Sequence, residues 1–429
     1  MKRITVALLC LALVMSLSMG VLAAKKPTLN ILVRSSDLWN KVEDLSADFT
    51  AKTGIEVKFT KLPESQLYDR IALVGATGNN PFDITATGHF GAAQYGMAGY
   101  FAELPIPEDA EDFIPSTIDQ WKVGDKLYGW PVITDTNLYF YRQDLFDKYG
   151  IAGPAQTWDE FRDIARKLTI DKNGNSSTDP NFDPNNVEVW GAIFKGAQNN
   201  ASTGEWCNWL LQNGGEVLDE DFNVIVNEKP SVDSLQYLAD LLHKDKVMPQ
   251  SITGFGYTEF HTFFVQGKAA QAINWLYMYD MSNDPEASKV VGKVGIAPMP
   301  QGVRKSGMMG GWSWNVFEDS KNKEAALEFI KYMTSPEVGW ELALLGNPPV
   351  RTSVFQQLID EKGHPWPIVL DQLQYGEAQN HLATGQTTAI ERDLQLAIQK
   401  VLLGEETAQE ALDESAKNIE AILTKSGVK

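Results

Sequence analysis

The sequence predicts an α/β protein made of more than one domain. Residues 29–33 and 55–59 are short apolar or alternating runs typical of strands, and a helical pattern that ends at Gly54 separates them. This β-α-β order favours parallel strands joined by a right-handed crossover. A chain of 429 residues is long enough for two or three domains. Because no repeat or long linker interrupts it, we expect two lobes joined by crossings of the chain.

Residues 1–24 are expected to be a cleaved secretory signal peptide. Two basic residues open the chain, residues 4–22 are almost wholly apolar, and Ala23 and Ala24 offer small side chains to a signal peptidase. The alternative is an uncleaved membrane anchor, since the apolar run is nearly long enough to span a bilayer. We expect a periplasmic or extracellular protein.

The charge and the cysteine content narrow the function further. The chain has a net charge of −19 at pH 7, and removal of Lys2 and Arg3 with the signal peptide makes it −21. Such a surface repels nucleic acid, so no nucleic-acid partner is expected. Only Cys207 remains after cleavage, so no internal disulfide can form. We expect Cys207 to be a packed core thiol.

Helix signals continue along the rest of the chain. Capping boxes are expected to open two helices, one at Thr157 with Glu160 and one at Thr407 with Glu410. A further helix is predicted over 322–334, where buried positions recur at helical spacing before a proline.

The segment 171–186 is rich in Asn, Asp and Pro and is predicted to be an irregular surface loop. Its oxygen-bearing side chains resemble those of a calcium loop. However, Ser176 stands where such a loop needs glycine, and Phe182 where it needs glutamate. We favour a surface loop built on Asx-turns, and calcium binding is left open for Asp171, Asn173, Asn175 and Asp179.

Motifs for catalysis are missing from the sequence. It has no phosphate-binding GxxxxGK[ST], no HExxH and no CxxC, and its five histidines lack ligand spacing. Residues 311–315 contain GxS without the closing glycine of a nucleophile elbow. We therefore expect no enzymatic activity, no metal and no cofactor. A secreted glycoside hydrolase remains an alternative, because paired carboxylates cannot be recognised from sequence in so acidic a chain.

The aromatic residues favour carbohydrate binding. Sugars present apolar C–H faces that stack on aromatic rings, and hydroxyl groups that bond Asp, Asn, Gln and Arg. The chain has 12 Trp and 13 Tyr. For a single tryptophan, packing in the core is the more common role, but as a group we favour binding for those at predicted strand ends or loops: Trp39, Trp130, Trp275, Trp312 and Trp314.

Several segments together resemble the extracellular solute-binding proteins of the maltose-binding type. Residues 128–146 are similar to the crossing strand of that family and the YRKDLF-like run that follows it. Further similarities occur in family order over most of residues 29–423, at 157–161, 267–270, 294–300, 310–314, 325–338, 349–353 and 402–416.

The resemblance implies a two-lobed periplasmic-binding-protein-like α/β fold, with a hinge of several crossings and a ligand cleft between the lobes. We expect lobe one at 25–133 plus 296–348 and lobe two at 134–295 plus 349–429. The ligand would be a sugar, oligosaccharide or polyol, and lobe closure would present it to the permease subunits of an ABC importer. We expect a monomer. A chemosensory binding subunit with the same fold is a further alternative.

By analogy with the family, the ends of strands and two turns supply the ligand-binding side chains, because ligands of open α/β sheets bind beyond the carboxyl ends of strands. Trp275 and Trp312 are expected to stack on the ligand, with Trp314 facing the packed interior. The full set of expected ligand-binding residues is Asp37, Trp39, His89, Asp135, Trp275, Gly310, Gly311, Trp312 and Arg351.

Overall fold

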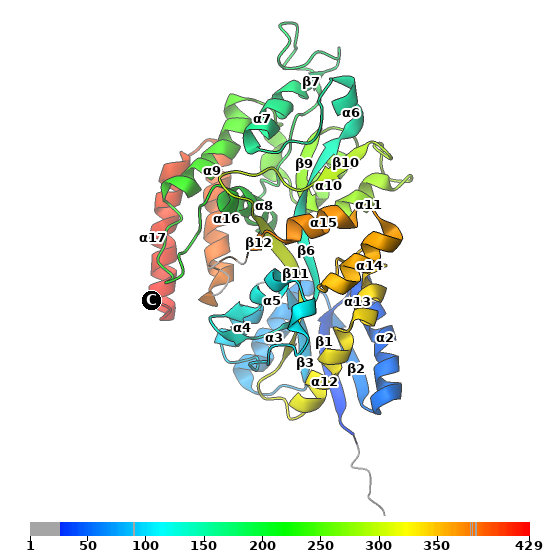
Figure 1. Cartoon of the computed structure of the whole chain (residues 1–429). Coiled ribbons are helices and arrows are strands. Elements are labelled where there is room, and N and C mark those ends of the chain that lie inside the picture. Colours follow the sequence, from blue (N-terminus) through cyan, green and yellow to red (C-terminus); the bar gives the residue numbers. More distant parts are fainter. Residues whose placement is uncertain (1–25, 89–90, 378, 380, 382–383) are drawn as a thin grey trace, which may run out of the picture.

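The computed structural model describes residues 26–88, 91–377, 379, 381 and 384–429. The expected signal peptide, residues 1–24, and the candidate ligand residue His89 lie outside the described residues. Within them, one sheet of eight strands runs through the molecule in the order β10-β6-β11-β3-β1-β2, with β9 paired to β6 and β12 to β11. Helices surround this sheet at both ends (Figure 1).

The lower part of the molecule in Figure 1 begins with the predicted β-α-β unit. Strand β1 (Thr28–Arg34) pairs in parallel with β2 (Glu56–Leu62), and α2 (Asp37–Thr53) connects them. Gly54 ends α2 in the left-handed conformation, with a φ of 73°, which glycine adopts at low cost. Strand β3 (Ile84–Gly88) pairs in parallel with β1 on its other side. The remaining lower elements are α3 (Glu64–Thr77), α4 (Gly91–Met97), α5 (Pro115–Asp119), β4 (Lys122–Val123), β5 (Lys126–Leu127), α12 (Lys323–Met333) and α13 (Pro336–Ala343).

Two long antiparallel strands connect the lower part to the upper part. Strand β6 (Trp130–Arg142) pairs through its first half with β11 (Gly307–Val316). Its second half pairs with β9 (Gln271–Trp275) on one side and β10 (Val294–Ala297) on the other. The same strand is thus part of both halves, as Figure 1 shows along its length.

The upper part is mainly helical. Thr157 caps α7 by accepting the N–H of Glu160, and the predicted capping box of Thr407 and Glu410 opens α17. The upper elements are α6 (Gln143–Lys148), α7 (Trp158–Lys167), β7 (Ile170–Asp171), β8 (Val187–Val189), α8 (Asn200–Gln212), α9 (Lys229–Ala239), α10 (Tyr257–Val265), α11 (Tyr277–Asn283), α14 (Thr352–Lys362), α15 (Trp366–Leu373), β12 (Gly376–Glu377), α16 (Thr387–Leu403) and α17 (Ala408–Ser426). No helix in the described part of the chain combines the length and apolar composition needed to cross a membrane.

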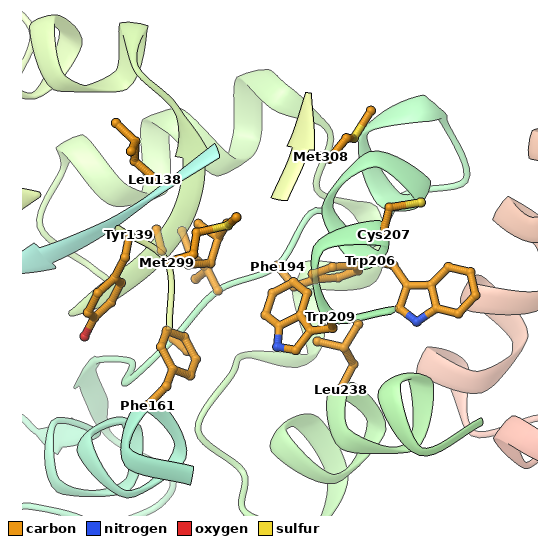
Figure 2. Packing of buried hydrophobic residues seen from close by; sticks show 14 of the residues in the cluster. Leu138, Tyr139, Phe161, Phe194, Trp206, Cys207, Trp209, Leu238, Met299 and Met308 are labelled. Carbon is orange, nitrogen blue, oxygen red and sulfur yellow. The ribbon is translucent and has the colours of Figure 1, made fainter. Parts of the chain in front are cut away.

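Buried apolar residues of the described chain form two clusters, which we call the lower core and the upper core. The lower core takes its residues from 29–133 and 312–350. The upper core takes almost all of its residues from 138–309 and 354–423. Figure 2 shows part of the upper core, where Trp206, Trp209 and Cys207 on α8 pack among residues from several other elements.

Two of the lobe boundaries expected from the sequence fall later in these cores, the second only slightly, since Val350, expected in lobe two, packs in the lower core. Residues 296–309 were assigned to lobe one, but Ile296, Met299 and Met309 pack in the upper core. The reason is that β10 pairs with the upper half of β6, so the chain after it stays in the upper part until β11 returns. Within the described residues, the chain therefore passes between the cores in β6, at Gly310–Gly311 in β11, and between Val350 and Val354.

Candidate functional site

Two adjacent glycines mark the place where β11 passes between the cores. Gly310 pairs with Asp135 of β6, and Gly311 pairs with Thr134. A Cβ atom at Gly310 would lie 3.0 Å from the indole ring of Trp275 and 3.4 Å from the Cβ of Asp135. At Gly311 the φ is 122°, and a Cβ would lie 2.4 Å from the carbonyl oxygen of Ile133. The backbone is bare here because neighbouring groups leave no room for a side chain.

Four of the expected site residues therefore meet at this crossing: Asp135, Trp275, Gly310 and Gly311. The Oδ1 atom of Asp135 accepts the N–H of Thr136 at 2.9 Å. Burial raises the pKa of Asp135 to about 7, since desolvation disfavours the carboxylate more than its hydrogen bonds stabilise it. Near neutral pH, Asp135 can therefore present either a hydrogen-bond donor or an acceptor to a bound molecule.

A cavity of about 570 Å³ opens on the upper side of this crossing. Trp275 forms part of its wall, and the indole N–H donates to the hydroxyl of Tyr257 at 3.3 Å. The other lining groups are mainly amides and hydroxyls, with one acidic and one basic side chain, which suit a molecule rich in hydroxyl groups. The lining residues are Gln198, Asn200, Gly204, Tyr257, Trp275, Met308, Thr387, Thr388, Glu391, Arg392 and Gln395.

Sequence reasoning missed most of this cavity. Of the expected residues that the structure describes, Trp275 alone lines it. The contribution of α16 follows a helical stripe, with Thr388, Glu391, Arg392 and Gln395 at spacings of three and four residues. That stripe is visible in the sequence, but nothing local distinguishes it from a solvent-exposed face, because the fold alone brings α16 beside α8.

Trp312 and Trp39 lie in the lower core. Trp312 is 8% exposed. The guanidinium carbon of Arg34 lies 4.4 Å from the centroid of its ring. The rings of Trp312 and Trp39 meet in a T-shaped arrangement, with their centroids 5.8 Å apart. Trp39 is 0% exposed and also packs on Trp314, with ring centroids 5.0 Å apart. Trp39 is one of the buried residues of α2, and it points inward onto Trp312 and Trp314 of β11. Because its ring is fully buried, Trp39 is not available to stack on a ligand.

Asp37 and Gly88 occupy strand ends of the lower part. Asp37 is exposed and begins α2 directly after β1. Gly88 ends β3, pairs with Trp312 of β11, and donates its N–H to the hydroxyl of Tyr68 at 3.1 Å. Both lie at carboxyl ends of parallel strands, where the sequence analysis expected the lower lobe to contact a ligand.

Arg351 lies at the third passage between the cores and is bound by other groups. Its Nε donates to the carbonyl of Thr334 at 2.7 Å, and its two terminal nitrogens pair with Asp112 at 3.1 Å and Asp109 at 2.8 Å. The guanidinium also lies 4.1 Å from the ring centroid of Phe113, and the side chain is 5% exposed. Because these partners occupy it, Arg351 ties the third crossing to the lower part and does not line the cavity.

The loop that resembles a calcium site binds its own backbone. The Asp171 carboxylate accepts the N–H groups of Asn173 and Asn175 at 2.8 Å and that of Asp183 at 3.0 Å, and the Asn175 side-chain amide at 3.1 Å. These four N–H groups direct their positive ends at the two carboxylate oxygens of Asp171. They therefore occupy the positions from which a cation would bind this carboxylate. In the described ranges, no group of three or more His, Cys, Asp or Glu side chains is arranged to hold a metal ion.

A match to a known protein family identifies the class of protein to which this fold belongs. A family model described as bacterial extracellular solute-binding protein matches residues 38–340. The chain belongs to this family. The resemblance seen in the sequence is thereby confirmed.

Curated relatives of this solute-binding protein are related over most of their length. The mannitol-binding protein of Pseudomonas aeruginosa is 26% identical over 75% of this chain and 72% of its own. The galactooligosaccharide-binding protein of Bacillus subtilis is 23% identical over 97% of this chain and 96% of its own.

Solved structures confirm the two-lobed α/β fold. A solute-binding protein of Agrobacterium radiobacter K84 in complex with ribitol superposes with a TM-score of 0.75 at 25% identity, over 92% of this chain and 98% of its own. The maltose-bound MalE3 of T. maritima superposes with a TM-score of 0.75 at 24% identity, over 92% of this chain and 100% of its own.

Proposed function

We propose that this solute-binding protein captures a sugar, oligosaccharide or polyol between its lobes and delivers it to the permease of an ABC importer. The observation that carries the proposal is the cavity beside the bare Gly310–Gly311 backbone, which combines an aromatic wall with amide, hydroxyl and carboxyl groups. The names of the relatives, which include mannitol-binding and galactooligosaccharide-binding proteins, support this class of ligand.

The proposed site divides the ligand's contacts between apolar and polar groups. Trp275 and Tyr257, which we call the aromatic wall, stack against C–H faces, and Asp135 bonds a hydroxyl at the crossing. Each ligand hydroxyl that loses water without finding a partner costs about 1–3 kcal/mol, so many polar side chains are needed. On the upper side these are Gln198, Asn200, Thr388, Glu391, Arg392 and Gln395.

Closure of the lobes completes the site. The lower lobe supplies Asp37 and the backbone at Gly88 and from Gly311 to Trp312, which reach the ligand only when the lobes approach. A ligand shifts the protein toward the closed state only by binding that state more tightly, and contacts from both lobes supply this difference. The closed form then offers the importer a surface that the open form lacks.

We infer its export, its oligomeric state and its lack of catalysis together with this function. The protein is exported through cleavage of residues 1–24, acts as a monomer, and binds without catalysing a reaction. Its acidic surface keeps it from nucleic acid. Incubation with oligosaccharides should release no new reducing ends, and their appearance would favour a glycoside hydrolase instead.

A thermal-shift screen of residues 25–429 tests the ligand class. Sugars, sugar alcohols and oligosaccharides are compared with amino acids at equal concentration. A ligand at 100 times its dissociation constant should add about 2.7 kcal/mol to the free energy of unfolding and raise the melting temperature. Stabilisation by amino acids, with none by any sugar or polyol, would refute the proposed ligand class.

A further inference from the structure

A buried ion pair lies behind the cavity. The Lys195 Nζ is 2.9 Å from the Glu205 Oε2, and the two side chains are 1% and 0% exposed. The same carboxylate oxygen accepts the backbone N–H of Lys195 at 3.0 Å. The ammonium also donates to the carbonyl of Ile273 at 3.2 Å and to the Asn274 Oδ1 at 3.4 Å. Because Ile273 and Asn274 directly precede Trp275, Lys195 holds the end of β9 that carries this indole.

The same ammonium contacts the helix that carries the other half of the aromatic wall. It lies 4.1 Å from the ring centroid of Phe260 and 5.7 Å from that of Tyr257, both on α10. A cation over the face of an aromatic ring is attracted by the ring electrons, so these contacts favour one placement of α10. Glu205, on α8, is adjacent to Gly204, which lines the cavity. The pair thus joins α8, β9 and α10 at one point.

Stability alone does not account for this pair. Burial lowers the pKa of Lys195 and raises that of Glu205, so desolvation opposes both charges. The second carboxylate oxygen, Oε1 of Glu205, has no hydrogen-bond partner in the part of the chain that the structure describes. Replacing a buried ion pair by uncharged groups of similar volume is often neutral or stabilising, so such a pair contributes little to folding.

We propose that Lys195 and Glu205 form a positioning pair for ligand binding. The pair holds Trp275 and Tyr257 in the orientation in which the aromatic wall meets the ligand. This inference rests on the function proposed above and adds to it two residues that do not themselves contact the ligand. Without the pair, the end of β9 loses two hydrogen bonds, and the Trp275 indole is no longer kept against Gly310.

The test uses the double variant Lys195→Met with Glu205→Gln, which removes both charges and leaves neither buried alone. Protein labelled with 5-fluorotryptophan gives a fluorine NMR signal for Trp275, which Trp275→Phe identifies. In the ligand-free double variant, this signal should shift and broaden while the melting temperature stays within a few degrees of the wild type. An unchanged Trp275 signal would overturn the proposal, as would a large loss of stability with an unaltered signal in the folded fraction.

Tyr139→Phe is the matched control. It removes a buried hydrogen bond to Gln271, which lies at the opposite end of the same strand from Trp275. This variant should lower the melting temperature and leave the Trp275 signal in place. If it moves that signal as much as the double variant does, the effect is a general loosening of β9, and the specific role of the pair is refuted.

Titration calorimetry with maltose and with D-mannitol then measures the effect on binding. We expect the double variant to bind the preferred probe at least ten-fold more weakly than the wild type, with the Tyr139→Phe control close to wild type. Equal affinity of the double variant and the wild type would contradict the positioning role. If the wild type binds neither probe, neither maltose nor D-mannitol is its ligand, the thermal-shift screen decides the ligand class, and the Trp275 signal still decides whether the pair positions the wall.

Discussion

Trp275 and Trp312 were expected to play the same role, but they lie in different surroundings. Trp275 lines the cavity and is held at its edge by Tyr257 and Gly310. Trp312 packs between Arg34 and Trp39 in the lower core. The difference arises because tryptophans at strand ends look alike in sequence, whereas the helix that covers each of them is decided by the fold.

Alanine substitutions should separate the two tryptophans. Trp275→Ala should lower ligand affinity 5- to 150-fold, or about 1–3 kcal/mol, through loss of stacking and buried area. Trp312→Ala should instead cost about 3–5 kcal/mol of folding stability, because it opens a hole in the lower core. Calorimetric titration and thermal unfolding of both variants check this. A Trp275→Ala protein that binds normally but melts early would remove Trp275 from the site.

Asp135 should make stability depend on pH. Its pKa is raised from 3.8 to about 7 in the folded protein, so the folded state holds a proton that the unfolded state releases at lower pH. Its contribution to the free energy of unfolding should therefore fall as pH rises from about 4 to about 7. Asp135→Asn should remove this contribution, so between these pH values the melting temperature of the variant should rise more, or fall less, with pH than that of the wild type. Asp48→Asn, which removes an exposed carboxylate of α2, is the control and should leave the slope as in the wild type.

His261 should contribute the opposite slope over nearly the same pH range. Burial, assisted by the nearby Lys195 charge, lowers its pKa from 6.5 to about 4. Between these pH values the unfolded state binds a proton that the folded state does not bind. The contribution of His261 to the free energy of unfolding should therefore fall as pH drops from about 6.5 to about 4. His261→Gln should reduce this loss. A titration of the histidine ring by NMR that gives a pKa above 6 would contradict the argument.

At the scale of elements, the sequence predicted individual helices and strands better than it predicted which of them lie side by side. Alternation and Gly54 were enough for β1, α2 and β2, and the capping pattern was enough for the start of α17. Cys207 is buried, as expected of a core thiol. The segment 296–309 was assigned to the other lobe because its own residues do not show that β10 pairs with the upper half of β6. The cavity wall on α16 was missed for the same reason, since it depends on contacts far apart in the sequence.

The two glycines of β11 should respond differently to alanine. Gly311→Ala places a Cβ 2.4 Å from a backbone oxygen at a φ of 122°, so it should disrupt the pairing of β11 with β6 and lower the melting temperature strongly. Gly310→Ala meets the movable edge of Trp275 at 3.0 Å and should mainly weaken ligand binding. Thermal unfolding and calorimetric titration of both variants decide the matter, and equal losses of stability would contradict this assignment.

At the scale of the whole molecule, the two cores are joined where the proposed ligand binds. In the described residues, β6, β11 and the stretch from Val350 to Val354 pass between the cores, so a change in the angle between lobes acts on the same backbone that carries Asp135 and Gly310. Arg351 adds a fixed point at the third passage through its bonds to Asp109 and Asp112. Binding and closure are therefore coupled through short stretches of chain.

Both cores are assembled from separated stretches of the chain. The lower core needs residues near position 30 and residues up to Val350, whereas the upper core extends to Leu423. During translation, the first hundred or so residues therefore emerge without the β11 strand and the α12 helix that complete their packing. The lower core cannot be completed before Val350 has been synthesised, nor the upper core before Leu423, so most of the chain is made before either part can reach its final packing.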